Sequence, residues 1–308
     1  MIDYPAARAL AMVVQTGSFE GAARMLGVTP SAVSQRVRQL EERIGAVLVE
    51  RASPCTATAE GARLCRHMEQ VGMLERELLD HLPGLGGGDR LPVTLDIAVN
   101  ADSLGTWFLP ALAPFAEATG FLLNIVIDDE EHTAEWLRRG RVLAAVTAMA
   151  RPVQGCQVTP LGRLRYAAAA SPAYVARHFP QGVTAEALGR APALTFSQKD
   201  RLQTDWARAE FGPGLTLPTH WLPSTQGFVE AALLGIGWGL NPELLLRGHL
   251  DAGRLVELMP GRGLDRPLFW QVSRLAAGRL SGLTREVTGA ARRALGPAAG
   301  PWQDADGS

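Results

Sequence analysis

Residues 17–51 read GSFEGAARMLGVTPSAVSQRVRQLEERIGAVLVER and contain the strongest local signals in the chain. Ser18 is a favourable N-cap for a short helix that ends at Gly27, where glycine suits a C-terminal stop. Thr29 and Pro30 then supply a cap and a first-turn proline for a second helix. Two short helices joined by a tight turn are typical of a helix-turn-helix, and an ordinary small helical bundle is the alternative.

The second helix of this pair has one apolar side and one polar side. Val33, Val37 and Leu40 share the apolar side, and the opposite side has small hydroxyl residues, a glutamine and arginines. Small side chains let a helix approach base edges in a major groove, and glutamine and arginine have the donors to read bases or bind phosphates. The residues predicted to contact DNA are Ser18, Thr29, Pro30, Ser31, Ser34, Gln35, Arg36, Arg38 and Arg51.

Two further elements are predicted beside these helices. Residues 47–51 and 57–58 flank the turn at 53–55 and indicate a short hairpin, or wing. A longer helix then begins at a Thr58 cap and has apolar residues every three or four positions. Such a seam favours helix pairing between subunits, and packing against the same chain is the alternative. The predicted dimerisation residues are Leu64, Met68, Val71, Leu74 and Leu78.

Length and charge limit what the chain does. With 308 residues it is too long for one compact core, so two or three domains are expected. Its 30 basic and 31 acidic residues give a net charge of -1, so any contact with DNA must be local. The sequence has neither a secretory signal nor an apolar run long enough to cross a bilayer, which predicts a cytoplasmic protein without a membrane partner.

The sequence does not favour an enzyme, because it has no nucleophile with its base, phosphate loop or metal cluster. Cys55, Cys65 and Cys156 are too few and too scattered for a disulfide framework or a zinc site, and they disfavour a redox sensor. The six histidines show no ligand spacing. The glycines of Gly235–Gly239 lack the spacing of a nucleotide loop. We therefore expect no metal and no cofactor.

A glycine-rich break at residues 84–88 predicts a hinge. Beyond it, strand-like runs alternate with helical stretches, which predicts an α/β domain of one or two lobes with largely parallel sheets. The runs lie at 93–99, 122–127, 143–148, 166–170, 193–196, 238–241 and 268–272.

The N-terminal motifs resemble a known family. The matching residues are Gly17–Phe19, Ala22, Ala23, Leu26, Val28–Ser34, Leu40, Glu41, Gly45, Leu48 and Arg51. Together they resemble the winged helix-turn-helix of LysR-type transcriptional regulators, which continue into a dimerising linker helix and a two-lobed effector domain like a type 2 periplasmic binding protein. The resemblance implies an α+β multi-domain chain. Its expected parts are a head at 1–58, a linker helix and hinge at 59–90, an effector domain at 91–296 (lobe I at 91–161 and 266–296, lobe II at 162–265), and a disordered tail at 297–308.

Looser motifs are similar to those of one branch of this family, the lysine and arginine export regulators LysG and ArgP. They are Asn100–Leu104 with Thr106 and Trp107, Gly155-Cys156, Pro160–Gly162, Pro223–Phe228 and Gly235–Gly239. Two positions depart from the pattern. Val49 stands where the family commonly has Phe, a tolerable change in a core, and Thr56 stands where this branch often has a basic residue, which weakens the wing's expected contact with the DNA backbone.

The resemblance implies a ligand in the cleft between the lobes, where strand ends and helix starts converge. Hydroxyls that open helices after the strands at 93–99 and 217–222 suit the α-carboxylate of an amino acid, with plain N-capping by Ser103 and Ser224 as the alternative. The acids at 128–131 suit the distal cation of a basic amino acid, or they form a solvated helix start. Trp238 is a further candidate for the wall of the ligand pocket. The predicted effector-binding residues are Asn100, Asp102, Ser103, Thr106, Trp107, Asp128, Asp129, Glu130, Thr147, Ser224 and Thr225.

The resemblance implies a dimeric or tetrameric regulator that binds operator DNA, senses lysine or arginine, and controls an amino-acid exporter gene, with RNA polymerase as a further partner. A LysR-type regulator of another metabolite is one alternative. A protein that binds a replication origin or nucleoid DNA is another. Removing Ser103 is expected to abolish the effector response while ligand-free DNA binding persists.

Overall fold

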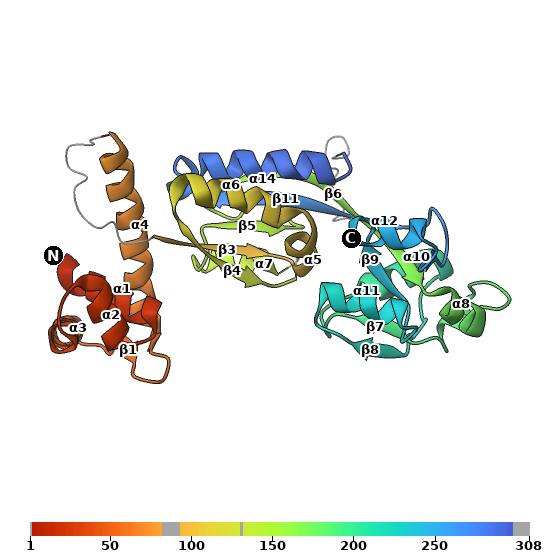
Figure 1. The fold of residues 1–308 in the computed structure, drawn as a ribbon, viewed down its shortest axis with the longest axis horizontal. Helices are drawn as coiled ribbons and strands as arrows, with labels where there is room; N and C mark the ends of the chain where they lie inside the picture. Colours follow the sequence, from red (N-terminus) through yellow and green to blue (C-terminus); the bar gives the residue numbers. More distant parts are fainter. Residues whose placement is uncertain (1, 82–92, 130–131, 298–308) are drawn as a thin grey trace. The chain divides into compact units, whose positions relative to one another are not determined.

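A computed structural model describes three stretches of the chain, residues 2–81, 93–129 and 132–297. The chain divides into two compact units, Met1–Leu95 and Asp96–Ser308, and each is considered by itself (Figure 1). Three predictions fall outside the described residues: the hinge at 84–88, Glu130 of the effector site, and all but the first residue of the tail at 297–308.

The first unit has three helices, a two-stranded hairpin and a long helix. Ser18 Oγ accepts a hydrogen bond from the Gly21 amide, and Thr29 Oγ1 accepts one from the Ala32 amide, so both predicted caps are present. Between the two helices Gly27 has a φ of 63°, a left-handed conformation that glycine adopts at little cost. The helix-turn-helix prediction is confirmed. The elements are α1 (Tyr4–Thr16), α2 (Phe19–Leu26), α3 (Pro30–Ile44), β1 (Val49–Glu50), β2 (Thr56–Ala57) and α4 (Ala59–His81).

The predicted wing is the antiparallel pair β1–β2, and it is joined to α3 by one carboxylate. Glu41 Oε1 accepts hydrogen bonds from the amides of Leu48, at 2.8 Å, and Val49, at 3.3 Å. Val49 is buried in the core of the head, so valine fills a core position there. Thr56 is exposed and donates to the carboxylate of Glu50 at 3.1 Å. Its hydroxyl therefore makes a contact within the wing.

Helix α4 begins directly after Thr58, whose hydroxyl accepts from the amide of the third helical residue, as predicted. Leu64 and Met68 pack against the core of the head. Farther along, Leu74 and Leu78 are 51% and 56% exposed. The apolar seam thus has two parts: its first turns pack on the same chain, and the outer part leaves two leucines in contact with solvent.

In the second unit, seven of the described strands form one sheet, in the order β10-β6-β11-β5-β3-β4 with β9 also paired to β6. A separate parallel pair is β7–β8. Helix α14 packs against α6 beside the sheet (Figure 1). The strands are β3 (Thr94–Val99), β4 (Leu122–Ile127), β5 (Ala144–Thr147), β6 (Cys156–Ala170), β7 (Ala193–Thr195), β8 (Thr219–Trp221), β9 (Gly239–Pro242), β10 (Val256–Glu257) and β11 (Leu264–Ser273). The helices are α5 (Ala101–Ser103), α6 (Leu109–Thr119), α7 (Thr133–Arg138), α8 (Pro172–His178), α9 (Ala185–Leu188), α10 (Leu202–Phe211), α11 (Thr225–Leu233), α12 (Glu243–Asp251), α13 (Arg274–Ala277) and α14 (Ser281–Ala294), with a π-helical turn at Leu104–Phe108 between α5 and α6.

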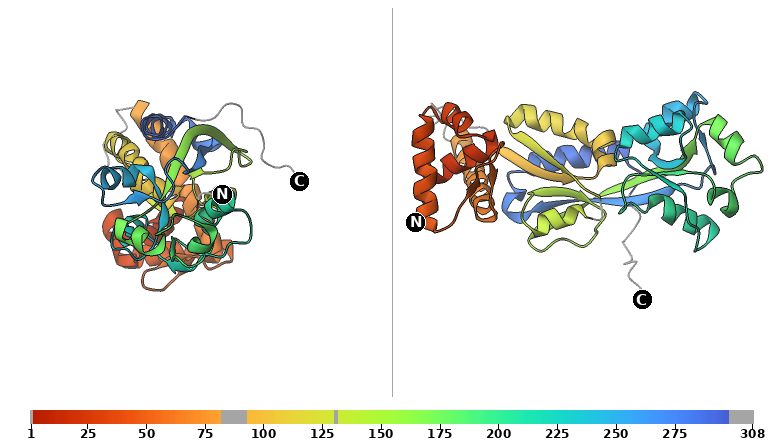
Figure 2. Two further views of the ribbon diagram at one scale, coloured as in Figure 1. Left: turned by 90° about the vertical axis from the view of Figure 1, so that its right-hand side faces the viewer. Right: turned by 90° about the horizontal axis from the view of Figure 1, so that it is seen from below.

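Two long strands, β6 and β11, connect the two ends of this unit, as Figure 2 shows from below. They pair antiparallel from Tyr166–Leu264 at one end to Cys156–Ser273 at the other. One end adds β5, β3 and β4, and the other adds β9 and β10. This arrangement agrees with a two-lobed effector domain, because the same pair of strands runs through both lobes.

The prediction of largely parallel sheets is wrong. β3–β5 and β7–β8 run parallel, but the two long strands do not: β11 runs antiparallel to β5 and β6, and β9 and β10 run antiparallel to β6. A buried strand is apolar on both faces whichever way it runs, so its pattern does not encode direction. The strand predicted at 166–170 begins earlier, at Cys156. The sequence did not show this earlier start because exposed residues interrupt the apolar pattern of 157–165.

Candidate functional site

The polar side of α3 faces solvent in the first unit. Ser31, Gln35 and Arg38 are exposed, and Ser34 and Arg36 are half-buried. The apolar side is buried in the core, as the sequence predicted. A helix placed in this way offers short hydroxyls and long donors on a single surface, which is the chemistry needed to read base edges in a major groove.

The other predicted DNA contacts lie around this helix. Ser18 and Thr29 use their hydroxyls as caps, and Pro30 occupies the first turn of α3. Arg51 follows β1 and keeps its side chain half exposed, with its guanidinium carbon 5.2 Å from the centre of the Phe19 ring. The same guanidinium lies 3.9 Å from the Glu41 carboxylate, so the aromatic ring and this carboxylate together hold it at the surface. Contacts of all these residues with DNA remain predictions.

The second unit contains a cavity of about 440 Å³, within the usual size range for small-molecule sites. Its wall comes from the chain after β3 and β4, from the segment between β7 and α10, and from α11 and β9. The apolar wall residues suit an aliphatic stem; they are Ala101, Ile127, Phe196, Leu202, Phe228, Leu240 and Pro242. The polar ones are Asn100, Asp102, Asp128, Asp129, Ser197, Gln198, Lys199, Asp200, Gln203, Thr225 and Asn241.

Asp102 connects three elements at the cavity. One carboxylate oxygen accepts from Thr225 Oγ1 at 2.7 Å, and the other accepts from Tyr166 Oη at 2.8 Å. Burial raises the pKa of Asp102 because a desolvated carboxylate disfavours its charge, and the two hydroxyl donors only partly oppose this shift. The nearby carboxylates of Asp200 and Asp129 raise the pKa further. A cationic ligand would relieve this repulsion.

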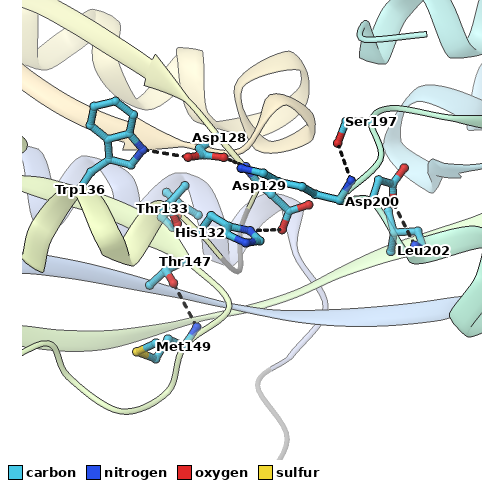
Figure 3. Close-up of polar contacts among 12 residues, drawn as sticks. Asp128, Asp129, His132, Thr133, Trp136, Thr147, Met149, Ser197, Asp200 and Leu202 are labelled. Carbon is cyan, nitrogen blue, oxygen red and sulfur yellow. Dashed lines mark hydrogen bonds and ion pairs between the residues drawn. The ribbon is translucent and has the colours of Figure 1, made fainter. Parts of the chain in front are cut away.

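Three more carboxylates line the same cavity (Figure 3). Asp128 accepts from the Trp136 indole and from the Asp129 amide, both at 2.9 Å, while Asp129 lies 3.8 Å from the imidazole of His132. The Asp200 carboxylate accepts hydrogen bonds from the backbone amides of Phe196 and Leu202, which lie on either side of it in the sequence. Burial raises the pKa of Asp200, and the charge of Asp129 raises it as well. Four acids therefore converge on a cavity in which Lys199 is the only basic residue of the described wall.

The structure brings only part of the predicted effector set to this cavity. Asn100, Asp102, Asp128, Asp129 and Thr225 line it. Five predicted residues do not belong to its described wall: Ser103, Thr106, Trp107, Thr147 and Ser224.

Each of these five has another place in the fold. Ser224 caps α11 through the Gly227 amide, as the alternative interpretation held, but the Ser103 hydroxyl makes no capping hydrogen bond although Ser103 directly precedes the π-helical turn. Thr106 Oγ1 donates to the backbone carbonyl of Asp102 at 2.6 Å. Thr147 Oγ1 accepts from the Met149 amide (Figure 3). Trp107 and Trp238 are buried and lie off the described wall.

Sequence reasoning missed six polar residues of the described wall: Ser197, Gln198, Lys199, Asp200, Gln203 and Asn241. A usable signal existed for Asp200 because it follows the strand at 193–195, as Asp128 follows β4. The same rule of polar residues after a buried strand selects both segments. Gln203 and Asn241 carried no such signal, because they lie inside a helix and a strand.

Other chemistries find little support in the described residues. Within 2–81, 93–129 and 132–297, no group of three or more His, Cys, Asp or Glu side chains is arranged to hold a metal ion. None of the helices in those stretches has both the length and the apolar character needed to cross a membrane. All three cysteines are buried and free, and burial raises the pKa of Cys65 to about 12, which keeps this thiol in its unreactive protonated form.

A helix-turn-helix head and a ligand-sized acidic cavity in one chain define a ligand-responsive DNA-binding regulator. Residues 6–62 match the model of the bacterial regulatory helix-turn-helix proteins of the lysR family, and residues 89–289 match that of the LysR substrate binding domain. The chain belongs to the LysR family of transcriptional regulators. Both the predicted family and the prediction of a regulator instead of an enzyme are confirmed by these matches.

Individual relatives agree with this assignment. The chain is 43% identical over 286 residues to the HTH-type transcriptional regulator ArgP of Pseudomonas fluorescens, covering 93% of this chain and 95% of the relative. It is similar to full-length LysG of Corynebacterium glutamicum with bound effector Arg, with a TM-score of 0.65, 37% identity, and coverage of 96% and 100%. The C-terminal domains of a LysR family protein from Agrobacterium tumefaciens are 64% identical, with a TM-score of 0.65 and coverage of 67% and 99%.

Proposed function

We propose that this regulator senses a basic amino acid, arginine or lysine, in the acidic cavity of its effector domain. The observation that carries the proposal is the convergence of Asp102, Asp128, Asp129 and Asp200 on one cavity that also has an apolar wall. Carboxylates bind an ammonium or a guanidinium by charge-assisted hydrogen bonds, and an apolar wall covers the aliphatic stem. The LysG relative with bound arginine and the relative named ArgP support the same ligand class.

The sensing residues proposed here are those of the predicted set that line the cavity, together with Asp200. Isothermal titration calorimetry of the full chain against arginine, lysine, histidine and leucine tests this function. We expect binding of arginine or lysine and no binding of leucine. Binding of leucine alone, or of none of the four, contradicts the proposal and favours a regulator of another metabolite.

The head is proposed to bind operator DNA through the exposed side of α3, with Ser34 and Gln35 choosing sequence and Arg38 adding affinity. Control of an amino-acid exporter gene and contact with RNA polymerase belong to the same proposal. Gel shifts with DNA upstream of candidate exporter genes, with and without arginine, test the target. A protein that binds DNA everywhere with equal affinity would instead fit the origin or nucleoid alternative.

Assembly into a dimer or tetramer is proposed to use α4, supported by the exposure of Leu74 and Leu78 on the outer part of its apolar seam. Solvent-exposed leucines at a spacing of four on one helix form a surface that a second helix can cover. Sedimentation of Leu74→Ala/Leu78→Ala against the wild type measures this. We expect a shift toward monomer, and an unchanged assembly would place the interface elsewhere.

A further inference from the structure

Gln203, in the first turn of α10, is an unusual wall residue of the effector cavity. Its side chain is only 1% exposed, yet it is part of the cavity wall. Neither its Oε1 nor its Nε2 has a hydrogen-bond partner among the described residues. It directly follows Leu202, whose amide is held by Asp200 in Figure 3, so the amide lies next to the acidic part of the site.

The other buried polar groups of the wall differ from Gln203 because they already have donors or acceptors within the protein. Asp102 receives two hydroxyl donors, and the hydroxyl of Thr225 is one of them. Asn241 donates from Nδ2 to the Gly239 carbonyl at 3.3 Å, although its Oδ1 has no partner in the described part of the chain. Gln203 thus leaves both a donor and an acceptor unused, and Asn241 leaves an acceptor.

Burying an amide without hydrogen bonds is costly, since the group loses its bonds to water and gains none. Replacing such a side chain by an apolar one of similar shape is nearly neutral or stabilising for the folded protein. A buried, unpaired glutamine on the wall of a ligand cavity is therefore explained if the ligand completes its hydrogen bonds.

We propose that Gln203 determines specificity for an α-amino acid by binding its zwitterionic end, with Nε2 donating to the α-carboxylate and Oε1, together with Asn241 Oδ1, accepting from N–H groups. This inference rests on the proposed function and names the part of the ligand that the four acids do not explain.

The charges of the site give the physical reason for this assignment. Carboxylates of the protein attract the cationic groups of the ligand but repel its α-carboxylate. Lys199, the only basic residue of the described wall, is exposed, so water weakens its attraction. A neutral amide donor in a buried position binds a carboxylate without adding a charge that would compete with the cationic end for the acids. Gln203 Nε2 meets this requirement.

Calorimetry with arginine and agmatine tests the role of Nε2, because agmatine is arginine without the α-carboxylate. Gln203→Met removes donor and acceptor at similar volume, and Gln203→Glu keeps an acceptor while replacing the donor by an anionic oxygen. In both variants we expect the preference for arginine over agmatine to fall about 10-fold or more, equivalent to about 1.4 kcal/mol. Gln181→Met, an exposed glutamine outside the described wall, is the matched control and should keep the wild-type preference.

The melting temperature of the ligand-free variants separates a ligand contact from a structural role. Gln203→Met should melt at the wild-type temperature or above, because it removes an unpaired buried amide. A lower melting temperature with an unchanged preference for arginine would overturn the inference. If the wild type binds leucine in place of arginine and loses that binding in Gln203→Met, the proposed basic ligand is wrong but the zwitterion subsite stands. A wild type that binds no amino acid overturns both.

Discussion

The DNA-binding head and the effector cavity differ in the sequence distance over which their key contacts form. In the head, Ser18 and Thr29 cap helices through amides three residues away. In the cavity, the hydrogen bond from Thr225 to Asp102 joins residues 123 positions apart. Contacts between residues close in sequence can be recognised from short motifs, whereas a cavity formed by distant segments is defined only once the sheet has assembled. We therefore expect mutations in the head to affect DNA binding alone and mutations in the cavity to affect ligand binding alone.

The largest effect is expected for Gly61→Ala, which breaks the head without touching the cavity. A Cβ on Gly61 would overlap the carbonyl oxygen of Leu48, a rigid backbone atom next to the wing. Overpacking against backbone should destabilise the head by about 3 kcal/mol. Calorimetric unfolding and gel shifts should show an early transition and lost DNA binding, while arginine binding persists.

The control for this change is Gly248→Ala, which lies in α12 with open space around the added methyl group. It should leave DNA binding unchanged and stabilise the protein by about 0.5 to 1 kcal/mol, the usual gain from replacing glycine inside a helix. Equal destabilisation by both alanines would show that the close approach to Leu48 is unimportant.

Asp102→Asn is the corresponding change in the cavity. The substitution removes one negative charge and one of the acceptors used by Thr225 and Tyr166. Loss of a charged partner from a partly desolvated pair should weaken binding of arginine by about 2 kcal/mol or more. Calorimetry measures the loss, and gel shifts without ligand should remain at the wild-type level. Glu117→Gln removes a charge outside the described wall and serves as the control; equal losses in both variants would refute a local role.

Arg38→Ala should weaken operator binding by about 1 to 3 kcal/mol, the usual range for one arginine contact with DNA. The side chain is exposed on α3, so its removal should leave the stability of the head unchanged. Arg190→Ala makes the same change in net charge at an exposed position in the turn after α9 of the second unit. Gel-shift affinities that fall equally in both variants would indicate a general charge effect and contradict a specific role for Arg38.

The sequence predicted the head better than the cavity, because contacts in the head join residues close in sequence and contacts in the cavity join distant ones. Helix caps, the wing and the buried side of α3 followed from neighbouring residues such as Thr29 and Val33. In the effector domain most strands were found, but the expectation of largely parallel sheets was wrong, because strand direction depends on the connections and not on the apolar pattern. Five of the eleven candidate ligand residues line the described cavity. Gln203 was missed because its importance comes from missing hydrogen-bond partners, which only the fold can show.

The pH dependence should be smaller and should separate Asp102 from the other acids. The pKa of Asp102 is higher in the folded state, so the folded protein binds a proton at the Asp102 carboxylate more tightly than the unfolded chain does. The contribution of Asp102 is therefore most favourable below about pH 4, the ordinary pKa of aspartate, and is lost as the pH rises through the raised value. The stability of the ligand-free wild type relative to Asp102→Asn should fall over this range. A relative stability that rises with pH would contradict the raised pKa.

The smallest effect is expected for Ser103→Ala, and here the structure changes the expectation drawn from sequence. Ser103 is fully buried, its hydroxyl has no partner among the described residues, and it lies off the described cavity wall. Removing an unpaired buried hydroxyl leaves no group unsatisfied, so the stability should change by less than about 1 kcal/mol. Arginine affinity should stay within about twofold of the wild type, a difference below about 0.5 kcal/mol. A lost response in calorimetry would restore Ser103 to the site, and it would mean that the ligand reaches behind α5 in a conformation different from this one.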